Sequence, residues 1–109
     1  MLSSSRSANR FDSSLDTQAT LTIRNGTHVP NLAGMARDSL SLEKYLRVVA
    51  VEDAVNKNYK QPVVVVVVLN EAYEQHGIAL ARKYGVVPVI VPPQGEPIPQ
   101  TDLLLILGQ

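Results

Sequence analysis

The sequence lacks several features, and each absence narrows its possible chemistry. It has no cysteine in 109 residues, which excludes disulfides, thiolate metal sites and a cysteine nucleophile. The absence of cysteine also suits a protein that works outside the reducing cytosol. The sequence also has no excess of positive or negative charge, because ten basic and ten acidic residues give a formal net charge of zero. No basic stripe is available to neutralise phosphates, which argues against nucleic-acid binding.

Long apolar segments are also missing. No run of about eighteen apolar residues is present, so the sequence predicts no membrane-spanning helix. The first nine residues are polar and lack the apolar stretch of a secretory signal peptide. If the protein acts outside the membrane, we expect its anchor to lie in an N-terminal part that is absent from this sequence.

The residues that are present divide the chain into two parts. Residues 1–18 are rich in serine and other polar side chains, and they cannot bury enough apolar surface to offset the entropy of ordering. We interpret them as a disordered linker or tail. The chain is 45% hydrophobic, and residues 19–109 are predicted to form one domain.

Hydrophobic periodicity and turn signals predict seven elements in the order βαββαββ. An apolar stripe after Pro30 favours the first helix, and Asn70 and Gly85 are suitable caps for the second. We expect a hairpin or a slightly longer loop between the second and third strands. The predicted strands are Ala19–Arg24, Leu46–Ala54, Pro62–Leu69, Val86–Val91 and Thr101–Leu107, and the predicted helices are Pro30–Lys44 and Glu71–Tyr84.

The third predicted strand contains six consecutive valines, Val63 to Val68, and therefore has no polar face. A strand of this kind is buried on both sides or lies centrally in a sheet. The order of the elements is typical of an α+β fold. We expect a ferredoxin-like split βαβ sheet with both helices on one face and an added edge strand.

The most specific stretch runs from Thr20 to Gly34 and reads as a strand, a turn and a helix. Asn25 and Gly26 predict a tight turn with positive φ angles. The string "NGT" followed by "VPNLAG" resembles the opening of the LytR C-terminal domain, the accessory domain of LytR–CpsA–Psr cell-wall proteins. The resemblance extends over residues 19–109. It departs at Asn31, where the family usually has glycine.

This resemblance implies a non-catalytic, extracytoplasmic role at the cell envelope. LytR–CpsA–Psr proteins are membrane-anchored, and their N-terminal catalytic domain resembles phosphotransferases that move undecaprenyl-linked glycopolymers onto peptidoglycan. That catalytic domain is absent from this sequence. The resemblance implies that the domain binds cell-wall polymer or an envelope protein, or positions the catalytic domain. A homodimer through an exposed edge strand is a further expectation.

Two short segments carry candidate ligand or partner contacts. The first segment, residues 24–27, precedes a predicted helix, so its N–H groups could form an anion nest. A turn followed by a helix cap also explains this sequence. The second segment places a tyrosine between lysines, a combination that could stack on a sugar ring or contact a partner. The candidate contacts are Arg24, Asn25, Gly26, Thr27, Lys57, Tyr59 and Lys60.

No catalytic or metal-binding pattern accompanies these candidates. The two histidines, His28 and His76, lack the carboxylate spacing of a zinc motif such as HExxH. Glu52 and Asp53 are adjacent on a predicted strand and point to opposite faces, so they cannot act as an acid–base pair there. The sequence therefore predicts no enzymatic activity, no cofactor and no metal ion.

A second interpretation places the chain in another class. The strand–helix–strand order and the string "DLLLILG" also resemble the anticodon-binding module of class II aminoacyl-tRNA synthetases, a small cytosolic α/β binding domain. The zero net charge and the missing helix between Val91 and Thr101 argue against this interpretation.

Overall fold

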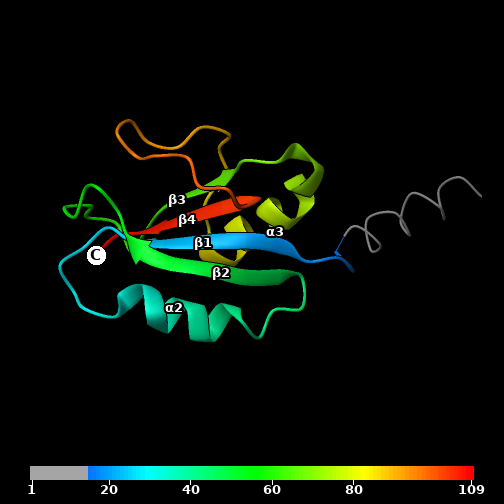
Figure 1. Cartoon of the computed structure of the whole chain (residues 1–109), viewed down its shortest axis with the longest axis horizontal. Helices are drawn as coiled ribbons and strands as arrows, with labels where there is room; N and C mark the ends of the chain where they lie inside the picture. Colours follow the sequence, from blue (N-terminus) through cyan, green and yellow to red (C-terminus); the bar gives the residue numbers. More distant parts are fainter. Residues whose placement is uncertain (1–14) are drawn as a thin grey trace, which may run out of the picture.

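The structure is a computed structural model that describes residues 15–109. Most of the predicted tail therefore lies outside the described residues. The domain contains a four-stranded mixed sheet and two α-helices (Figure 1). Its elements are β1 (Ala19–Asn25), α2 (Leu32–Leu40), β2 (Leu46–Asp53), β3 (Val63–Val68), the 3₁₀ helix η1 (Glu71–Tyr73), α3 (Glu74–Tyr84) and β4 (Leu103–Leu107).

The strand order is β2-β1-β4-β3. β1 is parallel to β2 and to β4, and β3 is antiparallel to β4. Both helices contribute side chains to the same core cluster, so they cover one face of the sheet. The predicted α+β class with two helices on one face is confirmed. Because three strands are parallel, the carboxyl ends of β1, β2 and β4 meet at one edge, which we call the carboxyl edge.

The strand order differs in detail from a split βαβ arrangement, because β1 and β2 pair directly with no strand between them. Burial explains the order. All five residues of β4 are buried and six of the seven residues of β1 are buried, so these two strands occupy the centre. In β2 only Leu46 is buried, and this strand forms an edge with a bulge at Val49.

The predicted strand Val86–Val91 is reduced to a single bridge between Val89 and Val67. The N–H and C=O of Val89 bond to Val66 and Val68 at 2.9 and 2.8 Å. Proline at 88, 92 and 93 removes N–H donors on both sides of Val89 and prevents a longer ladder. The valine strand β3 therefore lies at an edge whose outer side is only partly covered.

The connection between β2 and β3 is not a hairpin, because these strands lie at opposite edges of the sheet. Residues 54–62 instead cross the carboxyl edge. The Tyr59 N–H donates to the Gly26 carbonyl at 3.2 Å, and the Gln109 N–H donates to the Tyr59 carbonyl at 3.1 Å. This crossing places Tyr59 directly over the end of β1.

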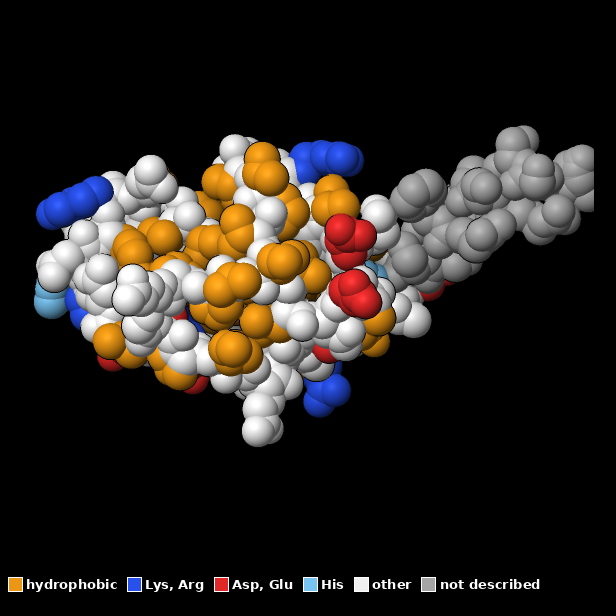
Figure 2. Space-filling view, turned by 90° about the horizontal axis from the view of Figure 1, so that it is seen from above, with side chains coloured by type: hydrophobic (Ala, Val, Ile, Leu, Met, Phe, Trp, Pro, Cys, Tyr) orange, Lys and Arg blue, Asp and Glu red, His pale blue; other side chains and the backbone are white. Residues whose placement is uncertain are grey.

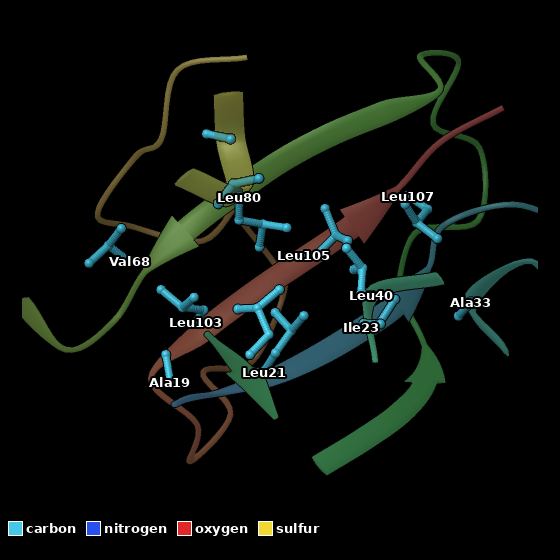
Figure 3. Packing of buried hydrophobic residues seen from close by; sticks show 13 residues of the cluster. Ala19, Leu21, Ile23, Ala33, Leu40, Val68, Leu80, Leu103, Leu105 and Leu107 are labelled. Atoms are coloured by element: carbon cyan, nitrogen blue, oxygen red, sulfur yellow. The ribbon is translucent and has the colours of Figure 1, made fainter. Parts of the chain in front are cut away.

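The core has two parts, one on each face of the sheet. On the helix face, Leu21, Ile23 and Leu105 pack against Leu40 of α2 and Leu80 of α3 (Figure 3). Each fully buried leucine or isoleucine contributes about 1.5–3 kcal/mol to the hydrophobic stabilisation. The second face carries a smaller cluster that consists of Ala54, Val67, Leu104 and Ile106.

The helix ends follow the predicted signals in part. Asn70 caps η1 by accepting a hydrogen bond from the Ala72 N–H at 3.1 Å, and Gly85 adopts the left-handed conformation after α3 with φ 71°. The first helix is shorter than predicted, since α2 ends at Leu40 rather than Lys44. The Ser41 hydroxyl donates to the Arg37 carbonyl at 2.7 Å, a local bond that competes with helix continuation.

Candidate functional site

Arg24 lies on the second face of the sheet and is only 3% exposed. Its Nε donates to Glu52 Oε2 at 2.6 Å, and its Nη1 donates to the Pro97 carbonyl at 2.6 Å. The same Nη1 lies 3.6 Å from Glu96 Oε1. These contacts hold the segment after α3 against the sheet. Arg24, which the sequence suggested as a ligand contact, therefore uses its guanidinium group for bonds inside the domain.

Glu96 connects the two irregular segments of the second face. Its carboxylate accepts hydrogen bonds from the N–H groups of Val55 and Asn56 at 3.2 and 3.1 Å, and from the Tyr59 hydroxyl at 3.4 Å. Burial raises the pKa of Tyr59, and the nearby Glu96 carboxylate raises it further. The sequence gives no indication of this role of Glu96, because a lone glutamate between glycine and proline carries no signal of long-range contacts.

The segment Asn25–Thr27 is buried, and its hydrogen-bond donors bond to acceptors inside the domain. The Asn25 carboxamide oxygen accepts from the Thr27 N–H and hydroxyl at 2.9 and 2.7 Å, and the Thr27 hydroxyl accepts from the Val29 N–H at 3.1 Å. The Gly26 N–H donates to the Leu107 carbonyl at 2.9 Å. These three N–H groups are therefore already bonded and do not form an open anion nest.

The prediction of positive φ at Asn25 and Gly26 is wrong. Among the described non-glycine residues, positive φ occurs only at Asn31, with φ 64°. Gly26 is needed for another reason, because an added Cβ would meet the Tyr59 ring and would lie 2.7 Å from the Leu107 carbonyl oxygen. Asn31 is the position at which glycine was expected from the resemblance, and the left-handed conformation found there is the one that glycine adopts without steric cost.

An open hollow of about 220 Å³ lies at the carboxyl edge, between the ends of β1 and β2 and the start of α2. Its polar groups combine carboxylates and carboxamides. Glu52 is paired with Arg24, and Asp53 is paired with Lys57 at 2.9 Å, so the acidic charges are largely compensated. The residues that line this hollow are Asn25, Asn31, Ala33, Gly34, Val51, Glu52 and Asp53.

The structure brings some of the predicted contact residues together and separates others. Asn25 lines the hollow, and Lys57 lies at its rim through the ion pair with Asp53. Tyr59 is half-buried against Gly26, and Lys60 is exposed on the same crossing segment. The side chain of Arg24 points to the second face. Glu52 and Asp53 both border the hollow but bind different partners, as their alternation along β2 predicts.

The two histidines have different environments. His28 is exposed, whereas His76 is 1% exposed and its Nε2 lies 2.7 Å from the Thr17 carbonyl oxygen. The His76 ring packs edge-on against Tyr73, with ring centroids 5.0 Å apart. Within residues 15–109, no group of three or more histidine, aspartate or glutamate side chains is arranged to hold a metal ion. No helix in this range is long and apolar enough to span a membrane.

Comparison with known proteins identifies the family. A protein-family model described as LytR cell envelope-related transcriptional attenuator matches residues 18–109. No curated protein and no solved structure matched the chain. The matched range covers the whole sheet and both helices, and it favours the envelope interpretation over an anticodon-binding module. The chain belongs to the LytR C-terminal domain family, a family of cell-envelope accessory domains.

Proposed function

We propose that this domain is the non-catalytic, extracytoplasmic accessory domain of a LytR–CpsA–Psr glycopolymer transferase and that it binds cell-wall polymer at its carboxyl edge. Membership of the LytR C-terminal domain family supports the envelope assignment. In this proposal the catalytic domain and the membrane anchor belong to an N-terminal part of the parent protein. The domain holds the polymer near that catalytic domain.

The observation that supports polymer binding is the hollow at the carboxyl edge. Its carboxylates and the Asn31 carboxamide oxygen are acceptors, while the Asn31 side chain and the first turn of α2 offer N–H donors. Because Arg24 and Lys57 compensate the carboxylates, the hollow favours neither a strong cation nor a strong anion. A neutral polyhydroxylated chain, which both donates and accepts hydrogen bonds, fits this environment best.

Retention on purified peptidoglycan sacculi at low salt tests the proposal. We expect the wild-type domain to be retained and the double variant Asp53→Ala/Lys57→Ala, which removes the ion pair at the rim, to be released. The matched control is Glu43→Ala/Lys83→Ala, which removes an ion pair of 3.1 Å on the helix face. Failure of the wild-type domain to bind sacculi at low salt would contradict polymer binding.

An envelope protein, including the parent's own catalytic domain, is the second candidate partner. The observation that favours it is a group of exposed aliphatic side chains after α3, because glycans offer little to such a surface. The expected homodimer stays a prediction, and sedimentation at several protein concentrations checks it.

A further inference from the structure

The segment after α3 exposes a concentration of aliphatic side chains that we call the apolar strip. Figure 2 views the side on which this segment lies and shows many hydrophobic side chains gathered across the middle of that face. Soluble domains rarely expose such areas unless they bind a partner there. The apolar strip consists of Val87, Val89, Ile90, Val91 and Ile98.

A groove of about 400 Å³ borders the apolar strip near the start of α3. Val68 and Leu69 line this groove together with Ile90 of the strip. Glu71 and Glu74 complete the lining. Figure 2 shows acidic side chains at one border of the hydrophobic area. The groove therefore combines an apolar wall with a negatively charged rim.

The charge of this rim is uncompensated within the described part of the chain. Neither the Glu71 nor the Glu74 side chain forms an ion pair or hydrogen bond with residues 15–109, and both residues are exposed. By contrast, Glu43, Glu52 and Glu96 each pair with a lysine or an arginine. An incoming basic group would find two free carboxylates beside an apolar surface.

The backbone of the strip determines how a partner can bind. The bonds of Val89 to β3 fix this segment against the sheet, and the prolines at 88, 92 and 93 remove N–H groups that an added strand would need. The strip thus presents side chains rather than a free strand edge. Recognition must come from apolar packing and charge.

We propose that the groove and the apolar strip dock a segment of a partner protein in which an apolar side chain is flanked by lysine or arginine. The inference rests on the second candidate above and specifies the chemistry of that partner. The groove is separate from the hollow at the carboxyl edge. Failure of this inference would therefore leave polymer binding intact, and loss of sacculus binding would leave this inference intact.

Titration of the full chain with three short peptides, followed by amide NMR, tests the inference. The probes are acetyl-Lys-Leu-Lys-Phe-amide, its acidic counterpart acetyl-Glu-Leu-Glu-Phe-amide, and acetyl-Lys-Ser-Lys-Ser-amide, which lacks the apolar side chains. We expect the first peptide to shift the amides of Val68, Leu69 and Ile90, and to bind roughly threefold to tenfold more tightly than either of the others.

Variants make the assignment specific. Glu71→Lys/Glu74→Lys should reverse the preference between the basic and acidic peptides, and Ile90→Ser should weaken both. The control Leu42→Ser removes an aliphatic side chain of similar exposure, 83% against 78% for Ile90, from another surface and should change nothing. Equal affinity for the basic and acidic peptides, shifts confined to another surface, or no shifts at all would overturn the inference. Concentration-dependent self-association that broadens Ile90 would also overturn it, because a second copy would then be the occupant.

Discussion

Asp102 Oδ2 accepts two hydrogen bonds from Thr20, one from its N–H and one from its hydroxyl, both at 2.9 Å. These bonds join the residue before β4 to the second residue of β1. Asp102 Oδ1 also accepts a bond from the Asn70 side chain at 3.0 Å, which links the cap of η1 to the same carboxylate. The Asp102 side chain therefore links β1, β4 and η1 at the amino ends of β1 and β4, opposite the hollow.

This carboxylate makes the stability of the domain sensitive to acid. Burial alone would raise the pKa of Asp102, but the hydrogen bonds from Thr20 and Asn70 outweigh burial and hold the pKa below its ordinary value of 3.8. A depressed folded-state pKa adds stability that is fully present above the unfolded pKa and is lost as the pH falls through the folded pKa. We expect Asp102→Asn to cost about 1 kcal/mol at pH 7 and almost nothing well below pH 3.8, measured by urea unfolding at both pH values. An equal cost at both pH values would contradict this assignment.

Asn31 should tolerate glycine and reject alanine. Its left-handed φ of 64° is easy for glycine and costs other L-residues about 1 kcal/mol or more. We expect Asn31→Gly to preserve or raise the midpoint of thermal unfolding, and Asn31→Ala to lower the free energy of unfolding by about 1 kcal/mol. Equal stability of the two variants would show that this backbone conformation is not required.

Removal of Glu96 should strongly destabilise the second face. Glu96→Ala leaves buried Arg24 with one carboxylate fewer and leaves two N–H groups of residues 55 and 56 without their acceptor. We expect a loss of about 3 kcal/mol and faster amide exchange at Val55 and Asn56. The control Glu43→Ala breaks only a surface pair and should cost under about 1 kcal/mol. Unchanged exchange at residues 55 and 56 would refute the role of Glu96.

Gly108 should be intolerant of any side chain. A Cβ at this position would collide with the Gln61 carbonyl, which is backbone and cannot rotate away. Gly85 is a useful comparison, since a Cβ there meets nothing within 4 Å although φ is 71°. We expect Gly108→Ala to cost about 3 kcal/mol or to prevent folding, and Gly85→Ala to cost about 1 kcal/mol, both measured by circular dichroism during thermal unfolding. Similar melting temperatures of the two variants would contradict the predicted collision.

Local signals in the sequence predicted the caps of the second helix and the valine strand, but not the backbone conformation of Asn25 and Gly26. Asn70 and Gly85 are caps because each satisfies the helix terminus within a few residues. The valine run forms a strand because its apolar β-branched side chains favour one wherever it lies. Each of these features depends mainly on neighbours along the chain.

The order of the strands and the contacts of the second face depend on distant residues. β2 and β4 both pair with β1, but only the fully buried β4 also pairs with β3, so β2 is left at an edge, and the sequence of β2 alone cannot reveal this. The pairing of Arg24 with Glu96 joins residues 72 positions apart in the sequence. The hollow could not be predicted from the sequence either, because Asn31, Glu52 and Asp53 meet only after α2 has folded over the sheet.

The parallel pairing of β1 with both neighbours has a mechanical consequence. The described chain enters at the amino end of β1, while the hollow lies at the carboxyl end of this strand, seven residues and about 20 Å further on. A pull between the entering chain and a polymer held in the hollow would run along β1. Such a load would shear the hydrogen bonds to β2 and β4, so that all of them carry it at once. It would not break these bonds one after another. The central strand of this domain is therefore oriented to resist tension between its two ends.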